Sequence, residues 1–229
     1  MVGEMSELAS EPITVDVVSD VMCPWCYIGK RRLEKALAES PVPIVVRWHP
    51  FQLDPTLPEG GKDRKQYLAE KFGSAGLAAD RYAHVEAAGA AEGIPFAFEK
   101  IAVSPNTLDA HRLVRWAAAE GREDAVVEAL FRAYFIEGRN LADRAVLAAV
   151  AGEAGLDAEA IARRLATDED IPEITAQIRR AGEIGITGVP TFIVGNRYAV
   201  VGAQPPEAIL QAVAAVARER DVEPTETGV

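Results

Sequence analysis

The segment ITVDVVSDVMCPWCYIGKRRLEKAL, residues 13–37, decides the fold of this chain. It begins with the apolar, β-branched run Ile13–Val18, which is typical of a buried strand, and it continues in a helical pattern to about Glu39. Between the two lie Cys23 and Cys26, the only cysteines in 229 residues. This order places Cys23 at a helix N-terminus, where unpaired backbone N–H groups and the helix dipole favour a thiolate.

The spacing of the two cysteines suits redox chemistry better than metal binding. Cys26 follows Cys23 by one helical turn, so the two thiols share a face and can close a disulfide. The rival interpretation is half of a zinc site, which needs four ligands. The chain has no second cysteine pair, and His49, His84 and His111 lack the spacing of zinc ligands. We therefore expect a redox-active Cys23–Cys26 pair, with no metal and no bound cofactor.

The rest of the chain predicts two halves of one sheet around a helical block. Ile44–Trp48 is a second strand, and a strand–helix–strand unit of this size indicates a parallel pair. Strands return at Thr191–Val194 and Tyr198–Val201, joined by a Gly195-Asn196 hairpin turn and followed by a closing helix from Pro205 to about Glu219. We therefore expect an α/β protein with a sheet-forming part at 12–55 and 183–220 and a helical insertion at 62–182.

Within the insertion the helical period dominates. Helices are predicted at 62–73, 77–92, 105–120, 122–137, 143–154, 157–167 and 172–184. Ser104 is the expected N-cap of the third, with Pro105 as its first residue, and Asp143 and Asp157 are expected N-caps further on. Large apolar side chains recur at helical spacing and predict a bundle core: Leu113, Trp116, Leu130, Phe131, Tyr134 and Phe135.

Charge and hydropathy argue against several classes of partner. The net charge is −11, and the basic runs Lys30-Arg31-Arg32 and Arg179-Arg180 are too small for a nucleic-acid surface. No apolar stretch reaches 18 residues, so no membrane span is expected. Residues 1–12 carry three glutamates and lack the features of a signal peptide. These features predict a cytoplasmic protein whose thiols are mostly kept reduced.

The chain resembles the DsbA-like thioredoxin superfamily, and within it the FrnE-like branch of disulfide oxidoreductases. The resemblance extends over about residues 13–218 and rests on four stretches: residues 19–29, residues 48–53, residues 104–107 with 110–113, and residues 185–192 with 202–204. The first and fourth stretches together are specific for the superfamily, whereas the other two narrow the resemblance to one branch of it. The resemblance implies a thioredoxin-like fold with a large all-α helical insertion.

The resemblance also implies roles for individual residues. Cys23 would attack a disulfide and Cys26 would resolve the mixed disulfide that results. In the family the residue matching Pro190 follows a cis peptide bond and faces the two cysteines, which would leave the backbone of Val189 free to pair with a bound peptide or glutathione. The plainer alternative is that Pro190 only begins an edge strand. Pro24 and Trp25 would set the geometry and polarity around the thiols.

For several polar residues the sequence allows two interpretations of their role. Asp20, three residues before Cys23, could move protons during resolution, although capping or solvation is the simpler reading. Asp16 lies within an apolar strand and could be a buried base. His111 and Arg112 could form a polar wall of the cleft, and His111 could tune the thiolate or be an ordinary buried histidine. His49 is a weaker candidate, and His84 weaker still.

Three functions compete at this stage. The favoured one is a thiol–disulfide oxidoreductase or isomerase acting on protein or small-molecule thiols and disulfides, as a monomer or weak homodimer. The second is a glutathione-dependent isomerase or transferase, related to 2-hydroxychromene-2-carboxylate isomerases and kappa-class glutathione transferases. It would bind glutathione as a co-substrate along Val189 and near Ala203 and Gln204. In those enzymes a serine typically replaces Cys23 and the second cysteine is missing. The third is a chaperone or binding module.

Overall fold

The computed structural model describes residues 11–73 and 75–222. Its main sheet has the strand order β2-β1-β5-β6. Strands β1 and β2 run parallel, whereas β5 is antiparallel to both β1 and β6. The four strands are β1 (Ile13–Ser19), β2 (Ile44–Pro50), β5 (Thr191–Val194) and β6 (Tyr198–Val201). The predicted parallel pair and the predicted hairpin are both confirmed.

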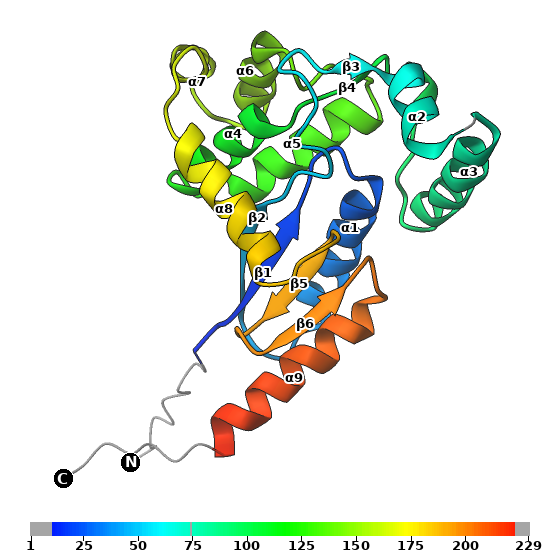
Figure 1. Cartoon of the computed structure of the whole chain (residues 1–229). Coiled ribbons are helices and arrows are strands. Elements are labelled where there is room, and N and C mark those ends of the chain that lie inside the picture. Colours follow the sequence, from blue (N-terminus) through cyan, green and yellow to red (C-terminus); the bar gives the residue numbers. More distant parts are fainter. Residues whose placement is uncertain (1–10, 74, 223–229) are drawn as a thin grey trace.

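Three helices pack around this sheet. Helix α1 (Pro24–Glu39) packs against α9 (Pro206–Val222), which in turn contacts β5 and β6. Helix α8 (Ile171–Glu183) packs against β2. Figure 1 shows the remaining helices gathered above the sheet, with α9 below it. The α/β fold with a helical insertion between β2 and β5 is thus confirmed.

All seven predicted helices of the insertion are present. They are α2 (Arg64–Phe72), α3 (Ala75–Ala91), α4 (Leu108–Ala118), α5 (Glu123–Phe135), α6 (Arg144–Glu153), α7 (Ala158–Leu165) and α8. The insertion also holds the 3₁₀ turn η1 (Phe98–Lys100) and a two-stranded sheet of β3 (Lys62–Asp63) and β4 (Val103–Ser104). Two-residue strands are too short to show an alternating pattern, so they could not be predicted from the sequence.

The predicted start of the third helix is wrong. Ser104 does not cap it, because this residue is extended in β4 and pairs with Lys62. Helix α4 begins three residues later than Pro105, at Leu108, with Thr107 at the N-cap position. The Asn106 side chain accepts the Leu108 N–H at 3.0 Å. Asn106 thus satisfies a backbone donor at the start of α4, which is the role predicted for Ser104.

The other local signals are confirmed. Asp143 accepts the Ala145 N–H and Asp157 accepts the Ala160 N–H, so both cap their helices. The β5–β6 turn has positive φ at both Gly195 (58°) and Asn196 (57°), and Arg197 N–H donates to the Val194 carbonyl at 3.1 Å, so Gly195 and Asn196 are the central residues of a turn with the twist that hairpins favour.

Aromatic side chains join α1 to the insertion. Tyr27 on α1 stacks on Phe131 of α5 with ring centroids 5.0 Å apart, and it also contacts Phe135. Phe131 and Phe135 are completely buried. The predicted bundle core is confirmed, since all six large apolar residues named for it are buried. This core holds the cysteine-bearing helix against α5.

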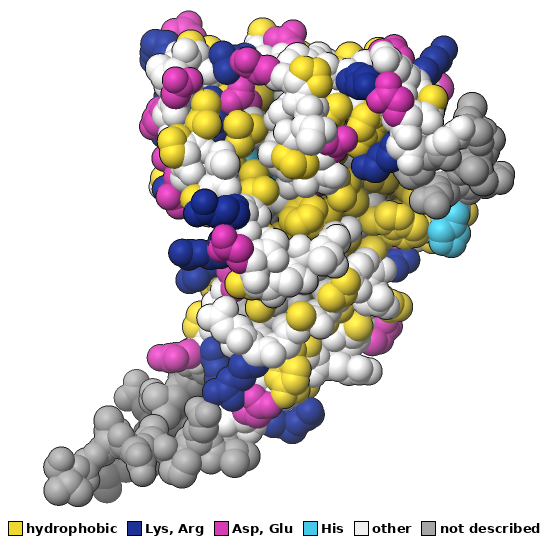
Figure 2. Space-filling model, in the orientation of Figure 1, with side chains coloured by type: hydrophobic (Ala, Val, Ile, Leu, Met, Phe, Trp, Pro, Cys, Tyr) yellow, Lys and Arg dark blue, Asp and Glu magenta, His cyan; other side chains and the backbone are white. Residues whose placement is uncertain are grey.

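The surface carries both charged and apolar regions. Figure 2 shows hydrophobic side chains gathered across the middle of this face, between the helices above and the β5–β6 hairpin below. Within residues 11–73 and 75–222, we find no helix of the length and hydropathy needed to span a bilayer.

Candidate active site

Cys23 lies at the N-cap of α1, immediately before Pro24. Its backbone is extended, with φ −92° and ψ 113°, and its N–H donates to the Asp20 carbonyl at 3.0 Å. The Cys23 thiol lies 3.7 Å from the carbonyl oxygen of Val189. The first turn of α1 carries no acidic side chain. The thiol therefore meets the positive end of the helix dipole without an opposing carboxylate in that turn.

Cys26 lies one turn further along, beneath Cys23. Both cysteines are free thiols, and Cys26 is the more deeply buried, at 1% exposure against 4% for Cys23. Burial raises the pKa of Cys26 well above its ordinary value, and contact with Cys23 raises it further. Hydrogen bonding with Ser19 and with the backbone of Asp20 opposes this rise only in part. The two buried thiols thus differ in position: Cys23 lies at the helix end, whereas burial and contact with Cys23 favour the protonated form of Cys26.

Pro190 follows Val189, whose carbonyl contacts the Cys23 thiol. The Val189–Pro190 peptide bond is cis, as the resemblance implied. Pro190 packs closely on α1: a Cβ added to Gly29 would lie only 2.8 Å from the Pro190 ring. Pro190 directly precedes Thr191, the first residue of the inner strand β5.

The loop after β6 adjoins the same region. Gly202 N–H donates to the Pro190 carbonyl at 2.8 Å, and the guanidinium of Arg32 on α1 donates to the carbonyl of Ala203. Gln204 is exposed, and its amide donates to the Val201 carbonyl at 3.1 Å. Ala203 and Gln204 therefore lie beside the Pro190 loop, whereas their predicted role in binding is still a prediction.

Asp20 does not cap α1 and is not solvated, so the simpler of its two interpretations is wrong. Its side chain is completely buried. One carboxylate oxygen accepts the Leu53 N–H at 2.8 Å and the other accepts the Met22 N–H at 3.3 Å. These bonds hold the turn before Cys23 against the segment after β2. A role for Asp20 in proton movement stays a prediction.

His111 comes from α4 and reaches the same segment. Its Nε2 lies 2.8 Å from the Phe51 carbonyl oxygen and 3.7 Å from a carboxylate oxygen of Asp20. A carbonyl oxygen only accepts, so Nε2 carries the hydrogen in the Phe51 contact. The interpretation of His111 as a buried, hydrogen-bonded histidine is confirmed. A role in tuning the thiolate stays a prediction.

Arg112 does not form a wall of the cleft. It is completely buried in the helical insertion. Its guanidinium donates to the Asp109 carboxylate and to the carbonyl oxygens of Arg164, Thr167 and Glu169. Four acceptors around one guanidinium indicate that Arg112 fixes the α7–α8 connection to α4.

The remaining candidates lie in two places. Trp25 is partly buried and its ring lies 5.6 Å from that of His84, which the sequence had ranked as the weakest histidine. The Asp16 carboxylate accepts a hydrogen bond from His49 Nε2 at 2.7 Å. Asp16 is therefore engaged with His49 on the sheet and is not an unpaired buried base.

The segment after β2 contributes more to this site than the sequence indicated. Phe51 N–H donates to the Ser19 carbonyl at 3.0 Å, the Phe51 carbonyl receives His111, and Leu53 N–H binds Asp20. All these contacts use backbone atoms of the 48–53 stretch. The one signal in the sequence that could have indicated this role is that residues 48–53 are among the stretches that carry the family resemblance. Among the residues that the structure describes, no group of three His, Cys, Asp or Glu side chains is arranged to hold a metal.

Comparison with known families agrees with this geometry. The DSBA-like thioredoxin domain family matches residues 14–214. Because this match covers most of the chain, the protein belongs to the DsbA-like thioredoxin domain family.

Solved structures extend the comparison. A probable DsbA oxidoreductase from Streptomyces coelicolor is 35% identical, with a TM-score of 0.82, and the match covers 95% of this chain and 93% of that one. Two structures below 25% identity share the fold. A 2-hydroxychromene-2-carboxylate isomerase is 18% identical (TM-score 0.69; 91% and 98% covered). The cytosolic disulfide reductase DsbM from Pseudomonas aeruginosa, solved with GSH, is 23% identical (TM-score 0.61; 91% and 99% covered).

Proposed function

We propose that this protein is a thiol–disulfide oxidoreductase or isomerase that exchanges disulfides through Cys23 and Cys26. The observation that carries the proposal is the position of Cys23, at the N-cap of α1 and 3.7 Å from the Val189 carbonyl. Membership of the DsbA-like thioredoxin domain family supports an oxidoreductase role. We include a cytoplasmic location in the proposal, because a cytosolic disulfide reductase shares the fold.

In the first step the Cys23 thiolate attacks one sulfur of a substrate disulfide. A bond forms between Cys23 and that sulfur, the substrate S–S bond breaks, and the other substrate sulfur leaves as a thiolate. The helix N-terminus stabilises the anionic form of Cys23 that this attack requires. Pro24 and Trp25 flank the thiol, so they limit the directions from which a substrate can approach.

In the second step Cys26 resolves the mixed disulfide. Its thiolate attacks the Cys23 sulfur, the bond to the substrate breaks, and the second substrate thiolate leaves. The substrate has then gained two electrons, and the protein holds a Cys23–Cys26 disulfide. Cys26 must lose its proton first, and the nearby Asp20 and His111 are the groups we expect to influence this. Two external thiols restore the dithiol by the reverse steps, since the first forms a mixed disulfide with Cys23 and the second releases it as an external disulfide. Running the cycle backwards oxidises a substrate dithiol.

Substrate binding is expected along Val189 and the apolar surface beside the dithiol. An extended peptide can pair with exposed backbone groups at a sheet edge, as an added strand. The hydrophobic side chains gathered between the helices and the β5–β6 hairpin would receive the apolar residues of such a peptide (Figure 2). Ala203 and Gln204, held beside the Pro190 loop, would contact the same substrate or a molecule of glutathione.

A glutathione-dependent isomerase or transferase is the second candidate. The fold shared with a 2-hydroxychromene-2-carboxylate isomerase favours it. In that chemistry the reacting thiol belongs to glutathione, so Cys26 would not be needed. Full activity of a Cys26→Ala variant in a glutathione-dependent isomerisation would therefore favour the second candidate over the first.

The proposal is tested by trapping the mixed disulfide. A Cys26→Ala variant, reduced and then mixed with oxidised glutathione, is expected to accumulate one glutathione adduct, seen by intact mass and removed by dithiothreitol. The wild type should instead end as the intramolecular disulfide. Cys23→Ala is the matched control and should form little adduct, because Cys26 is buried and its pKa is raised. Equal labelling of Cys23 and Cys26, or none at Cys23, would refute the mechanism.

A further inference from the structure

A cavity of about 660 Å³ lies between α8, α4, α5 and the edge strand β2. Its volume falls in the range of small-molecule sites, roughly 300–1,000 Å³. Neither cysteine lines it, and neither do Val189 and Pro190. Its wall reaches the active site only through Ser19, Val21 and His111. The cavity is therefore a separate place for a ligand, behind the dithiol.

Much of the cavity wall is apolar. Aliphatic side chains from several elements line it: Val21, Val114, Ala118, Ala119, Val127 and Ile174. Trp48 and Trp116 contribute to it as well. The indole N–H of Trp48 is buried and has no hydrogen-bond partner among the described residues. Such a wall suits an apolar ligand body, and an unpaired buried donor leaves room for a ligand acceptor.

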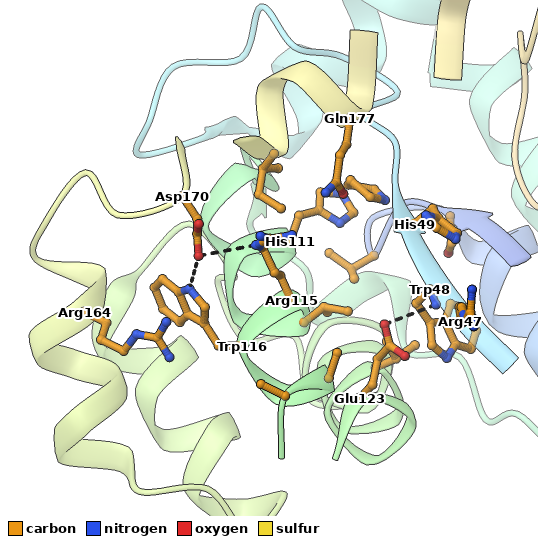
Figure 3. A pocket seen from close by; sticks show the side chains of 18 residues that line it. Arg47, Trp48, His49, His111, Arg115, Trp116, Glu123, Arg164, Asp170 and Gln177 are labelled. Carbon is orange, nitrogen blue, oxygen red and sulfur yellow. Dashed lines mark hydrogen bonds and ion pairs between the residues drawn. The ribbon is translucent and has the colours of Figure 1, made fainter. Parts of the chain in front are cut away.

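The charged groups around the cavity are mostly paired with one another. Figure 3 shows Trp116, Asp170 and Arg164 on one side and Arg47, Trp48 and Glu123 on the other. Asp170 accepts the Trp116 indole N–H at 2.9 Å and lies 3.4 Å from Arg115. Arg164 is paired with Glu169 at 2.6 Å. These pairs leave little net charge on the first side.

The second side carries Arg47 together with the carboxylate of Glu123. The Glu123 carboxylate accepts the Trp48 backbone N–H at 3.2 Å, and burial raises its pKa, which favours the neutral form. His49 is paired with Asp16. Arg47 is exposed and makes no ion pair or hydrogen bond within the described ranges, although it interacts at longer distance with Glu123. An unpaired arginine at the mouth of an apolar cavity is notable in a chain of net charge −11.

We propose that this cavity binds a small organic anion with an apolar body, such as an aryl or branched alkyl carboxylate. Its anionic group would pair with Arg47, for which the guanidinium fork is well suited. Its apolar body would lie among Val114, Val127 and Ile174. Because no active-site thiol lines the cavity, binding does not depend on the redox function proposed above.

Tryptophan fluorescence gives a direct test. The chain has three tryptophans, so a Trp25→Phe variant retains only Trp48 and Trp116, both of which line the cavity. Titration with phenylbutyrate is expected to give a saturable change in emission. The matched cation, phenylbutylamine, should give no such change at the same concentrations. A Cys23→Ser, Cys26→Ser variant should bind phenylbutyrate equally well, which separates this site from the dithiol.

Variants locate the binding within the cavity. In the same background Arg47→Gln should weaken phenylbutyrate binding about tenfold, the loss expected for one charged hydrogen bond. Arg179→Gln, on exposed α8 surface outside the cavity wall, is the matched control and should bind as before. Gln177→Phe should narrow the cavity and weaken binding, since Figure 3 shows this side chain reaching into it from α8. No saturable binding, equal binding of the amine, or equal affinity of both arginine variants would overturn the proposal.

Discussion

The N-terminal end of α1 and its middle differ in how their polar groups are paired. At the end, the Cys23 thiol contacts the Val189 carbonyl at 3.7 Å and the thiol of Cys26, with no charged partner among the described residues. In the middle, Lys30 is 2% exposed and its ammonium contacts Glu34, Asp124 at 3.1 Å and Glu128 at 3.4 Å. Burial alone would favour neutral Lys30, yet the hydrogen bond with Glu34 and the charges of Asp124 and Glu128 raise its pKa, so the cation persists.

This difference separates stability from reactivity along one helix. The Lys30 contacts join α1 to α5, and Arg31 adds a further pair with Glu128. With its middle held in this way, the helix does not need strong contacts at its first residue. A thiol with few hydrogen-bond partners stays available to a substrate. Each hydrogen bond to protein groups would make the thiol less reactive. The predictions below test whether the two functions can be changed independently.

The largest effect is expected at Cys23. Cys23→Ser should lower the rate of insulin disulfide reduction by about a thousandfold or more, because the attacking sulfur is lost. Its unfolding midpoint in urea should remain close to that of the reduced wild type, since Cys23 contributes little pairing to the fold. A large loss of stability in this variant would mean that the end of α1 has a structural role as well.

Lys30→Met should show the opposite pattern. The apolar part of the side chain is kept, but three carboxylates lose their shared cation, and the expected cost is about 2–3 kcal/mol because those carboxylates are partly exposed. Urea unfolding measures this change, and the rate of Cys23 alkylation should stay the same. Adding Glu34→Gln should recover part of the stability. A fall in alkylation rate equal to that of an active-site variant would show that the two regions are coupled.

Gly29→Ala should affect both properties, because Gly29 lies between the two regions. The new Cβ would approach the Pro190 ring to 2.8 Å and Phe192 to 3.1 Å, so the neighbours must shift. Overpacking of this kind costs about 1–3 kcal/mol. Both the urea midpoint and the Cys23 alkylation rate are expected to change. Gly182→Ala in α8, where nothing lies within 4 Å of the added Cβ, is the control: the higher helix propensity of alanine should raise the urea midpoint, by up to about 1 kcal/mol in free energy of unfolding, and the Cys23 alkylation rate should not change.

The buried thiol predicts a pH dependence of stability. Burial raises the pKa of Cys26, so the folded reduced protein holds this proton more tightly than the unfolded chain. The stabilisation is fully present below the unfolded pKa, about 8.5, and is lost as the pH rises through the folded pKa. Reduced wild type should therefore lose stability faster above about pH 8.5 than Cys26→Ala, in which the tyrosines still titrate. Parallel pH profiles for the two proteins would contradict this.

The smallest effect is expected at Lys35, on the same helix as Lys30. Lys35 pairs with Glu92 at 2.6 Å but is 52% exposed, and Arg32 also contacts Glu92 at 2.7 Å. Lys35→Gln should therefore cost less than about 1 kcal/mol in urea unfolding. A loss as large as that of Lys30→Met would show that burial is not what distinguishes the two lysines.

How much of this could be predicted from the sequence depends on the range of the interactions. The strands, the Cys-x-x-Cys at a helix start and the Asp143 and Asp157 caps depend on neighbours within a few residues, so their patterns were sufficient. Lys30 gave no such signal, because its partner Asp124 is 94 residues away and basic residues in a helix usually face water.

The errors have the same origin. Ser104-Pro105 has the pattern of a helix start, yet pairing of Ser104 with Lys62 across the β3–β4 sheet keeps that residue extended. Asp20 has the position of a capping residue, but its carboxylate accepts the Leu53 N–H after β2 and does not cap α1. Both outcomes were decided by contacts about 30 to 40 residues away along the chain, which a local pattern does not reveal.

The central claim is tested most directly by redox titration of the two cysteines. The protein is equilibrated in glutathione buffers of graded GSSG content, quenched in acid and alkylated, and its intact mass is measured. The account predicts one two-electron transition from the free dithiol to an intramolecular Cys23–Cys26 disulfide, lost in both single cysteine variants. Two thiols that remain free throughout, or that each take up glutathione independently, would contradict it.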